Sequence, residues 1–287
     1  MSFFIGIAVV LFSVFGGFVL AKGHLLALWQ PTEVLIIIGS AVGAFIIANP
    51  VKIIKESLEG FFKLLTAKKY KKSFFLDLLT LFFSLGTKIR GTGLLSIEED
   101  IENPKDSPLF SQYPNILKNE RLMTFIRDNM RIVISGNLSN YELENLLDNE
   151  IELIQEELEK PSVSIGMMAD GFPGFGIVAA VLGIVHTMQS LGGDSSELGK
   201  KVAGALVGTF LGVLLAYGVV GPIGQAIGGQ VHKEMKIYQC VKTLMLAFMA
   251  GTAPKMAVEY ARKVLYSDVR PDFLELEEFL KAPKSNA

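Results

Sequence analysis

Cysteine and histidine are scarce in this sequence, and the short motifs of common enzymes are missing from it. Its 287 residues include one cysteine, Cys240, and three scattered histidines. This scarcity excludes a disulfide framework and a metal cluster of histidine and cysteine. P-loop, G-x-S-x-G and H-E-x-x-H patterns do not occur either. We therefore expect neither an enzyme nor a bound metal or organic cofactor.

Acidic residues are also missing from the middle of every long apolar run. Those runs cover residues 3–21, 34–48, 171–191 and 202–231. A protein that moves ions through a membrane alone usually carries an ionisable group at mid-depth. Between the cores of the first two runs, the titratable residues are Lys22, His24 and Glu33. We therefore expect a partner to supply the acid if this chain handles an ion.

The four runs have the length and composition of membrane spans. A helix crosses the apolar part of a bilayer, about 30 Å thick, with roughly 20 residues. The second run is short, but Trp29, Gln30 and Pro31 stand where an interfacial anchor extends or caps a helix. The first run has no basic residue before it and no small-residue cleavage site after it. We therefore expect a retained helix and not a signal peptide.

Basic residues predict the orientation of these spans. Residues 51–160 hold 15 Lys or Arg, the tail after Val231 holds nine, and the two short connections hold only Lys22, Lys200 and Lys201. Cytoplasmic segments carry such an excess of positive charge. Both large segments and both termini are therefore expected in the cytoplasm. The net charge of −2 averages over compartments and gives no sign of nucleic-acid binding.

These patterns predict an all-α integral membrane protein with four transmembrane helices in two hairpins and a helical cytoplasmic domain. The predicted segments are transmembrane helices 1 and 2 in residues 1–50, a cytoplasmic helical loop domain in 51–168, transmembrane helices 3 and 4 in 169–231, and cytoplasmic C-terminal helices in 232–287. A helix from the fourth span is expected to continue to about residue 265, before a short acidic helix at 272–280.

Helix caps are expected at two places in the loop domain. Ser96 with Glu99, and Ser139 with Glu142, each match a capping box. The second box opens an acidic helix, and Pro161 is expected to end it.

Charged residues of the loop domain stand in blocks. Four lysines within residues 68–72 follow the second span and suit the anionic headgroups of membrane lipid. Lys88 and Arg90 then precede acidic residues at 98–102, across a turn that contains glycine. One interpretation is a solvated helical hairpin. The other is a docking face that engages and releases a large partner quickly, which charge complementarity favours.

Small residues form a ridge in the last apolar run. Gly204, Gly208 and Gly212 recur every four residues, and glycine and alanine also crowd residues 171–183. Small residues at this spacing let helix backbones approach closely. We expect this ridge to pack densely within an oligomer.

Two prolines and two hydroxyls mark the same pair of runs. Pro173 lies at the start of the third run and Pro222 near the end of the fourth. Each removes a backbone donor and loosens the helix locally. Thr209 and Tyr217 either line a narrow wet path or bond to backbone carbonyls, which is the commoner role of a threonine in a membrane helix.

Several blocks resemble one family, in the same order along the chain. They are DGFPGFGIVAAVLGIVH at 170–186, GTFLGVLLAYGVVGP at 208–222, DIENP at 100–104 and QCVK at 239–242. These blocks resemble the MotA family of bacterial flagellar motor stator subunits, within the MotA/TolQ/ExbB proton channel superfamily. The resemblance covers nearly the whole chain. It implies a location in the bacterial inner membrane and a role in flagellar motility and chemotaxis.

The resemblance also implies partners. MotA-like chains form a ring, thought to be a pentamer, around a dimer of the single-span protein MotB, whose membrane aspartate carries the ion. Their cytoplasmic loop pushes on the rotor protein FliG. By position, Arg90 and Glu98 match the rotor-contact charges of the family, and Glu150 is a weaker match to the same face.

The ion pathway follows from the resemblance in the same way. Pro173 and Pro222 match prolines that couple ion binding to movement, and Thr209 matches a hydroxyl beside the ion site. Sodium-driven relatives carry a threonine where this chain has Ala180, so one oxygen ligand is missing here. Dehydrated sodium needs several oxygens, whereas a proton needs an acid and a relay such as a hydroxyl. We therefore expect the proton to be the coupling ion, with Tyr217 as a further hydroxyl near its path.

Two other classes of function stay open at this point. The ExbB and TolQ energisers of outer-membrane systems use related chemistry, but they typically have three spans, and the fourth run argues against them. A self-contained channel or a purely structural membrane scaffold is the other class. The missing acid argues against a channel, and a scaffold would tolerate substitutions at Thr209 and Pro222 that keep packing.

Overall fold

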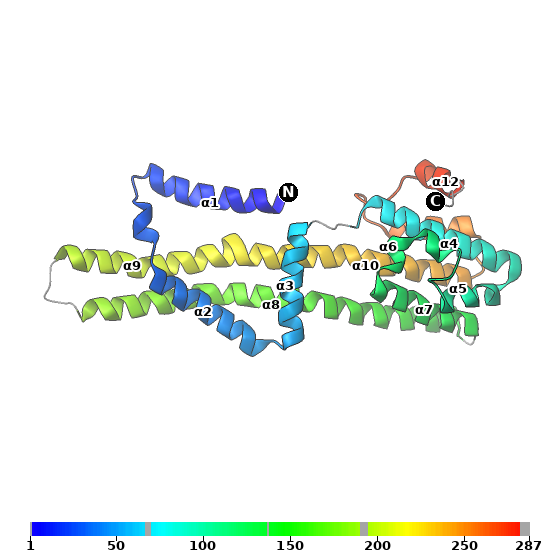
Figure 1. The fold of residues 1–287 in the computed structure, drawn as a ribbon, viewed down its shortest axis with the longest axis horizontal. Helices are drawn as coiled ribbons and strands as arrows, with labels where there is room; N and C mark the ends of the chain where they lie inside the picture. The colour runs from blue at the N-terminus through cyan, green and yellow to red at the C-terminus, as the bar shows by residue number, and fades with distance from the viewer. Residues whose placement is uncertain (1, 67–69, 137, 190–194, 282–287) are drawn as a thin grey trace. The chain divides into compact units, whose positions relative to one another are not determined.

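The computed structural model describes residues 2–66, 70–136, 138–189 and 195–281, and the regular structure in these residues is entirely helical (Figure 1). Four of the helices are long and apolar enough to cross a membrane. The predicted all-α fold with four spanning helices is therefore confirmed. The chain divides into two compact units, which are Met1–Lys68 with Leu158–Gly229, called the span unit, and Lys69–Glu157 with Gln230–Ala287, called the loop unit.

The span unit contains most of the predicted membrane spans. Its elements are α1 (Ser2–Leu20), the 3₁₀ turn η1 (Leu25–Leu28), α2 (Pro31–Ala48), α3 (Val51–Thr66), the C-terminal part of α8 (Asn140–Met188), α9 (Ser195–Val213), the π-helix η4 (Leu214–Val220) and the beginning of α10 (Gly221–Met249). Pro31 opens α2 at a position where a backbone N–H would have no helical partner in any case.

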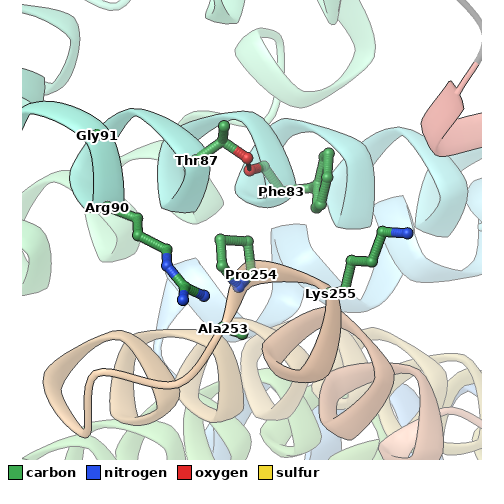
Figure 2. Close-up of a pocket in the computed structure, with 7 residues that line it drawn as sticks. All are labelled: Phe83, Thr87, Arg90, Gly91, Ala253, Pro254 and Lys255. Carbon is green, nitrogen blue, oxygen red and sulfur yellow. Dashed lines mark hydrogen bonds between the residues drawn. The ribbon is translucent and has the colours of Figure 1, made fainter.

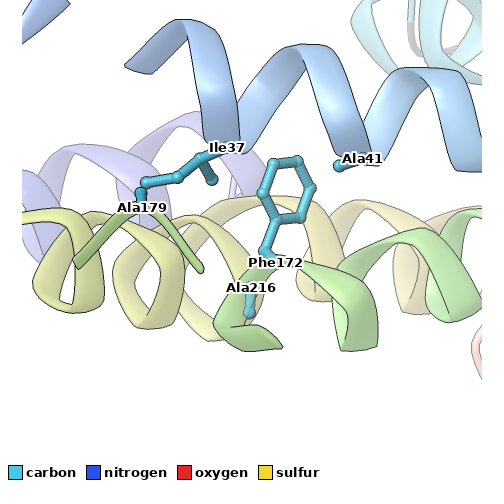
Figure 3. Packing of buried hydrophobic residues seen from close by; sticks show 5 residues of the cluster. All are labelled: Ile37, Ala41, Phe172, Ala179 and Ala216. Carbon is cyan, nitrogen blue, oxygen red and sulfur yellow. The ribbon is translucent and has the colours of Figure 1, made fainter. Parts of the chain in front are cut away.

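A small apolar core holds α2 onto α8 and the π-helix. It consists of Ile37 and Ala41 from α2, Phe172 and Ala179 from α8, and Ala216 from η4, all of them buried (Figure 3). The outer faces of the spans stay apolar, as Phe12 on α1 and Ile47 on α2 show with exposures of 81% and 89%. Helices that are hydrophobic on every face are typical of membrane spans.

The loop unit gathers the remaining helices. Its elements are α4 (Lys72–Thr92), η2 (Leu94–Ile97), α5 (Glu98–Glu102), η3 (Phe110–Gln112), α6 (Pro114–Leu117), α7 (Glu120–Ser135), the N-terminal part of α8, most of α10, α11 (Pro254–Val264) and α12 (Phe273–Lys281). Phe82 of α4 stacks on Phe248 of α10 with ring centres 6.2 Å apart, and Phe125 of α7 meets Tyr238 of α10 edge-on at 5.2 Å. Burial of these rings holds α4 and α7 against α10.

The two predicted capping boxes have different outcomes. The backbone N–H and the hydroxyl of Ser139 donate to Glu142 Oε2 at 2.9 and 2.7 Å, so this box is confirmed. The prediction of a capping box at Ser96 is wrong. The Ser96 hydroxyl donates to the carbonyl oxygen of Gly93 at 2.6 Å, and Glu99 is not its partner. The reason is that Ser96 lies within η2, so it does not stand at the position that precedes a helix.

The prediction that Pro161 ends the acidic helix is also wrong, because α8 continues through this proline. A proline inside a helix costs about 3 kcal/mol. Hydrogen bonds in the next turn offset part of this cost. The Ser162 hydroxyl donates to the carbonyl oxygen of Gly224 at 2.8 Å, and the Ser164 hydroxyl donates to Asn49 Oδ1 at 2.7 Å. The third predicted span is therefore the C-terminal part of one long helix.

The helix that follows the fourth span does not continue to residue 265 as predicted. It ends in a turn where Gly251 has a φ of +67° and the N–H of Thr252 donates to the carbonyl oxygen of Ala247 at 2.9 Å. Pro254 then opens α11. A left-handed glycine followed by a proline is a common sequence signal for the end of one helix and the start of the next. The short acidic helix at 272–280 is confirmed as α12.

Candidate functional site

Helices α8 and α9 of the span unit lie so close that only very small residues fit between them. A Cβ atom on Gly176 would lie 2.8 Å from the carbonyl oxygen of Gly208, and one on Gly212 would lie 2.6 Å from that of Phe172. The two backbones are therefore in direct contact. We call this contact the glycine seam; its members are Gly176 and Gly183 on α8 and Ala205, Gly208 and Gly212 on α9.

The predicted glycine ridge of α9 does its close packing inside this chain. Gly208 and Gly212 lie in the glycine seam. Gly204 faces the side chain of Gln30, whose Nε2 would lie 3.2 Å from a Cβ at that position. The ridge thus positions α9 against α8 and the start of α2, without need of a second copy.

Pro173 and Pro222 interrupt the helices next to the glycine seam. Pro173 lies inside α8, beside the residue whose carbonyl packs on Gly212. Pro222 is the second residue of α10, the helix that directly follows the π-helix. The N–H of Gly221 donates to the carbonyl oxygen of Ala216, five residues back, which is the wider spacing of a π-helix. Both prolines therefore stand where the regular α-helical ladder is broken.

Thr209 carries a hydroxyl for which no hydrogen bond is found in the described part of the chain. Five helical threonines donate to the carbonyl four residues back, namely Thr80, Thr87, Thr92, Thr187 and Thr243, whereas Thr209 does not. Thr209 also adjoins the seam, because its Cα would lie 3.4 Å from a Cβ on Gly176. A hydroxyl that is not used by its own helix remains available to an ion or to a proton relay.

Ala180 and Tyr217 occupy different environments. Ala180 is buried, and its backbone nitrogen would lie 3.2 Å from a Cβ on Gly208. Tyr217 projects from the π-helix and is 69% exposed. The structure therefore brings Ala180 and Thr209 together at the seam and leaves Tyr217 on the outside of the span unit, where lipid or another chain would meet it.

Sequence reasoning missed one residue of this site, Glu33. It lies in the first turn of α2 with an exposure of 7%, and its Oε2 has no hydrogen-bond partner. A Cβ on Gly208 would lie 3.0 Å from Oε2, and one on Gly183 would lie 3.3 Å from Oε1. The signal was the spacing, since Glu33 precedes the buried Ile37 and Ala41 on the same helix face. The chain therefore brings a buried acid of its own to the seam, which was not expected.

In the loop unit, several charges of the predicted docking region already have partners within the chain. Lys88 Nζ donates to Asp100 Oδ2 at 2.7 Å, and the Ser107 hydroxyl donates to Asp100 Oδ1 at 2.6 Å. Asp100 is buried, so these bonds hold the segment after α5 against α4. Arg131 of α7 donates to Glu102, and this hydrogen bond holds the pKa of the Glu102 carboxyl below its ordinary value.

Arg90 and Glu98 have neither an ion-pair nor a hydrogen-bond partner within the described ranges. Both side chains are exposed, on either side of Gly93, whose φ of +89° turns the chain from α4 into η2. Leu95 between them is 70% exposed. Unpaired charges beside an exposed apolar side chain suit contact with another protein.

Glu150 has a different environment from these two residues. Its Oε2 accepts a hydrogen bond of 2.7 Å from Asn129 Nδ2, and Asn129 is buried. This bond ties α8 to α7 inside the loop unit. The assignment of Glu150 to the rotor face stays a prediction.

A groove of about 470 Å³ opens beside Arg90, between α4 and the start of α11. Its lining residues are Phe83, Thr87, Arg90, Gly91, Ala253, Pro254 and Lys255 (Figure 2). Arg90 and Lys255 lie on opposite sides of Pro254 (Figure 2). The groove therefore combines an apolar floor with the positive charge of Arg90, which is unpaired in the described residues, and with Lys255, whose Nζ lies 3.9 Å from Glu277 Oε1. The charge of Arg90 suits an acidic surface of a partner.

Two family matches together cover most of the chain. Residues 4–93 match Motility protein A N-terminal, and residues 118–240 match the MotA/TolQ/ExbB proton channel family. Motility protein A of Salmonella typhimurium is 46% identical, over 99% of this chain and 97% of that protein. Motility protein A of Escherichia coli is 44% identical over the same shares, and chemotaxis protein LafT of Vibrio parahaemolyticus is 38% identical over 98% of each chain.

Solved structures share the fold. The structure of C. jejuni MotAB matches with a TM-score of 0.75 at 17% identity, over 95% of this chain and 98% of that chain. The flagellar MotAB stator complex from Bacillus subtilis matches with a TM-score of 0.69 at 24% identity, over 89% and 92% of the two chains. From the family matches and the full-length relatives, the chain belongs to the MotA/TolQ/ExbB proton channel family, as a multi-pass inner-membrane protein of the motility protein A type and not as an enzyme.

Proposed function

We propose that this chain is a stator subunit of the flagellar motor that, with a MotB-like partner, couples proton flow across the inner membrane to torque on the rotor. The observation that carries the proposal is the 46% identity to Motility protein A of Salmonella typhimurium over the full length of the chain. The shared fold of two MotAB structures supports a partner and an oligomer. In the proposal the oligomer is a pentameric ring and the rotor protein is FliG.

The proposed orientation has both termini and the loop unit in the cytoplasm. The distribution of basic residues supports it, since 15 of the 27 Lys and Arg lie within residues 51–160. The composition of helix α3 supports the further proposal that this helix contacts membrane lipid on the cytoplasmic side. It exposes Val51, Leu58 and Phe62 together with lysines, and an amphipathic basic helix of this kind lies at the membrane surface.

The proposed mechanism begins with a proton that binds an aspartate of the partner. Binding removes a costly buried charge, and this changes which ring subunit packs best against the partner. Thr209 supports the proton's path in this chain, because its hydroxyl is not bonded to its own helix. Pro173 and the π-helix before Pro222 supply joints at which the spans bend. When this change in packing is repeated from one subunit to the next, the ring rotates.

Deletion of the chain tests the proposal in a host where it is the sole stator candidate. We expect cells with a normal number of filaments that do not swim, and recovery of swimming when the chain is restored. Normal swimming combined with a defect in the outer membrane or in nutrient uptake would contradict the proposal. That outcome would instead indicate an energiser of the ExbB and TolQ type.

Reversal of the unpaired charges tests the proposed rotor face. We expect Arg90→Glu or Glu98→Lys to slow swimming, and we expect an opposite charge on the rotor to restore part of the speed. An exposed ion pair contributes up to about 1 kcal/mol, so each reversal should weaken rotor engagement by a factor of roughly five. The measurement is the rotation speed of tethered cells at equal levels of the protein.

Glu120→Lys is the matched control for these reversals, because Glu120 is an exposed acid on another helix of the loop unit. It should leave rotation unchanged. The docking role is refuted if both reversals, alone and combined, rotate like the unaltered protein, or if the control slows the motor as strongly.

A further inference from the structure

Glu33 is a buried acid that has no role in the mechanism proposed above. A carboxylate that is removed from water without a partner is costly, and in a membrane segment such a group usually marks an ion or proton pathway. In this chain no hydrogen bond or ion pair to Glu33 is found within the described ranges, although its exposure is only 7%. Its burial therefore calls for a ligand.

The position of the carboxylate is set by the glycine seam. Gly183 and Gly208 leave open the space into which its two oxygens point, because a Cβ at either position would lie within 3.3 Å of one of them. Ile37 and Ala41, on the same face of α2, fix the register of the helix by packing into the core of the span unit (Figure 3). Glu33 is thus held at the seam by the packing of its own helix.

The same place contains two of the predicted pathway residues, Ala180 and Thr209. Glu33 Oε2 and the backbone nitrogen of Ala180 lie 3.0 and 3.2 Å from one point, the position of a Cβ on Gly208. Thr209, with its unbonded hydroxyl, is the next residue. Glu33 therefore contacts the position on α9 that directly precedes the residue with the free hydroxyl.

We propose that Glu33 is a proton-binding site of this chain and relays protons toward the partner's acid past Ala180 and Thr209. The inference rests on the proposed function. In each cycle the carboxylate accepts a proton from water and becomes a neutral acid. It then gives that proton to a water beside it, or to the Thr209 hydroxyl, which passes its own proton to the next water in the same step. One O–H bond forms for each that breaks, and no electron is transferred.

A proton fits this site better than a metal cation. One carboxylate and one hydroxyl are too few oxygens to replace the hydration shell of sodium, whereas a single carboxylate is sufficient for a proton. Along the sequence, the titratable residues that follow or precede the seam on these elements include His186 on α8, Lys201 on α9 and His24 before η1. None of them forms a hydrogen bond or ion pair with Glu33 in the described residues.

The test compares Glu33→Gln with Glu33→Asp in the assembled complex. Glutamine keeps the size of the side chain but does not exchange a proton, whereas aspartate keeps the acid. A relay limits rate, so Glu33→Gln should lower the speed of the motor at low load by roughly tenfold or more. Torque at stall should stay near the original value, because it depends on the energy of the proton gradient and not on the transfer rate. Glu33→Asp should recover part of the speed.

Glu59→Gln is the matched control, because Glu59 is an exposed acid of the span unit that pairs with Lys63. It should leave low-load speed unchanged. Wild-type speed in Glu33→Gln would overturn the inference. A fall in stall torque in proportion to a fall in the number of assembled complexes would also overturn it, because that result indicates a purely structural role for Glu33. Neither result affects the proposed function, which is tested separately by deletion of the whole chain.

Infrared spectroscopy supplies a second readout that does not depend on rotation. The purified complex should show the C=O stretch of a protonated carboxylic acid that is absent from Glu33→Gln and shifted in Glu33→Asp. An unchanged band in both variants would overturn the inference even if a variant assembled poorly in cells.

Discussion

Replacement of Pro173 by alanine is expected to abolish torque while the complex stays assembled in the membrane. Alanine supplies the backbone N–H that proline lacks and removes the clash of the ring with the preceding turn. The change strengthens α8 locally by up to about 3 kcal/mol, beside the glycine seam. A joint that bends in each cycle would then become a straight helix. Rotation of tethered cells, together with the amount of complex that co-purifies with the partner, measures both effects.

Helix α8 contains its own control for this experiment. Pro161 also lies inside the helix, but away from the seam, next to Ser162 and its bond to Gly224. Pro161→Ala should keep rotation close to normal. Loss of the assembled complex in Pro173→Ala would mean that this proline is merely structural, and paralysis in both variants would show that any stiffening of α8 is harmful.

Substitution of Gly212 by leucine is expected to remove the protein from the membrane. A Cβ there would lie 2.6 Å from the carbonyl oxygen of Phe172 and 3.0 Å from Gly176 Cα. Both atoms belong to backbone, so the helices must separate. Overpacking usually costs about 1–3 kcal/mol and occasionally more, and a protein has only about 5–15 kcal/mol of stability. Gly212→Ala should therefore reduce the level of the protein, and Gly212→Leu should nearly eliminate it.

Gly174→Leu is the control for the seam. Gly174 lies in the same stretch of α8, but a Cβ there would contact no atom within 4 Å. Leucine also favours helix over glycine by about 1 kcal/mol, so the level of Gly174→Leu in the membrane should equal that of the original chain. Immunoblots of membrane fractions measure both variants. Normal levels of Gly212→Leu would show that α8 and α9 do not touch as described.

The elements that depend on local sequence could be predicted. Long apolar runs specify spanning helices because the bilayer leaves the backbone no other way to satisfy its hydrogen bonds. The capping box at Ser139 and the acidic helix α12 likewise follow from neighbouring residues. The break after Met249 was missed although Gly251 and Pro254 signal it, because the apolar pattern continues on both sides of the turn.

Features that depend on contacts between distant residues could not be predicted. Pro161 remains inside a helix because Ser162 and Ser164 bond to residues far away in the sequence. The π-helix has no distinctive composition of its own. Glu33 is buried only because its face of α2 meets α8 and α9, and no apolar run reveals which helix faces another.

The contact surface of the loop unit shows the same limit. Lys88 and Arg90 look equivalent in the sequence, as do Glu98 and Asp100. In the structure Lys88 and Asp100 form a pair with each other, whereas Arg90 and Glu98 have no partner in the described residues. The family resemblance assigned Arg90 and Glu98, the two unpaired residues, to the rotor contact. Their lack of a partner in the described residues gives a physical reason for that assignment.

Rotation of tethered cells in sodium-free buffer, followed before and after collapse of the proton gradient, tests the central claim most directly. The account predicts that rotation continues without sodium and stops when the proton gradient is removed, because Ala180, Glu33 and Thr209 together offer too few oxygens for sodium. Rotation that stops in sodium-free buffer while the proton gradient is intact would contradict it.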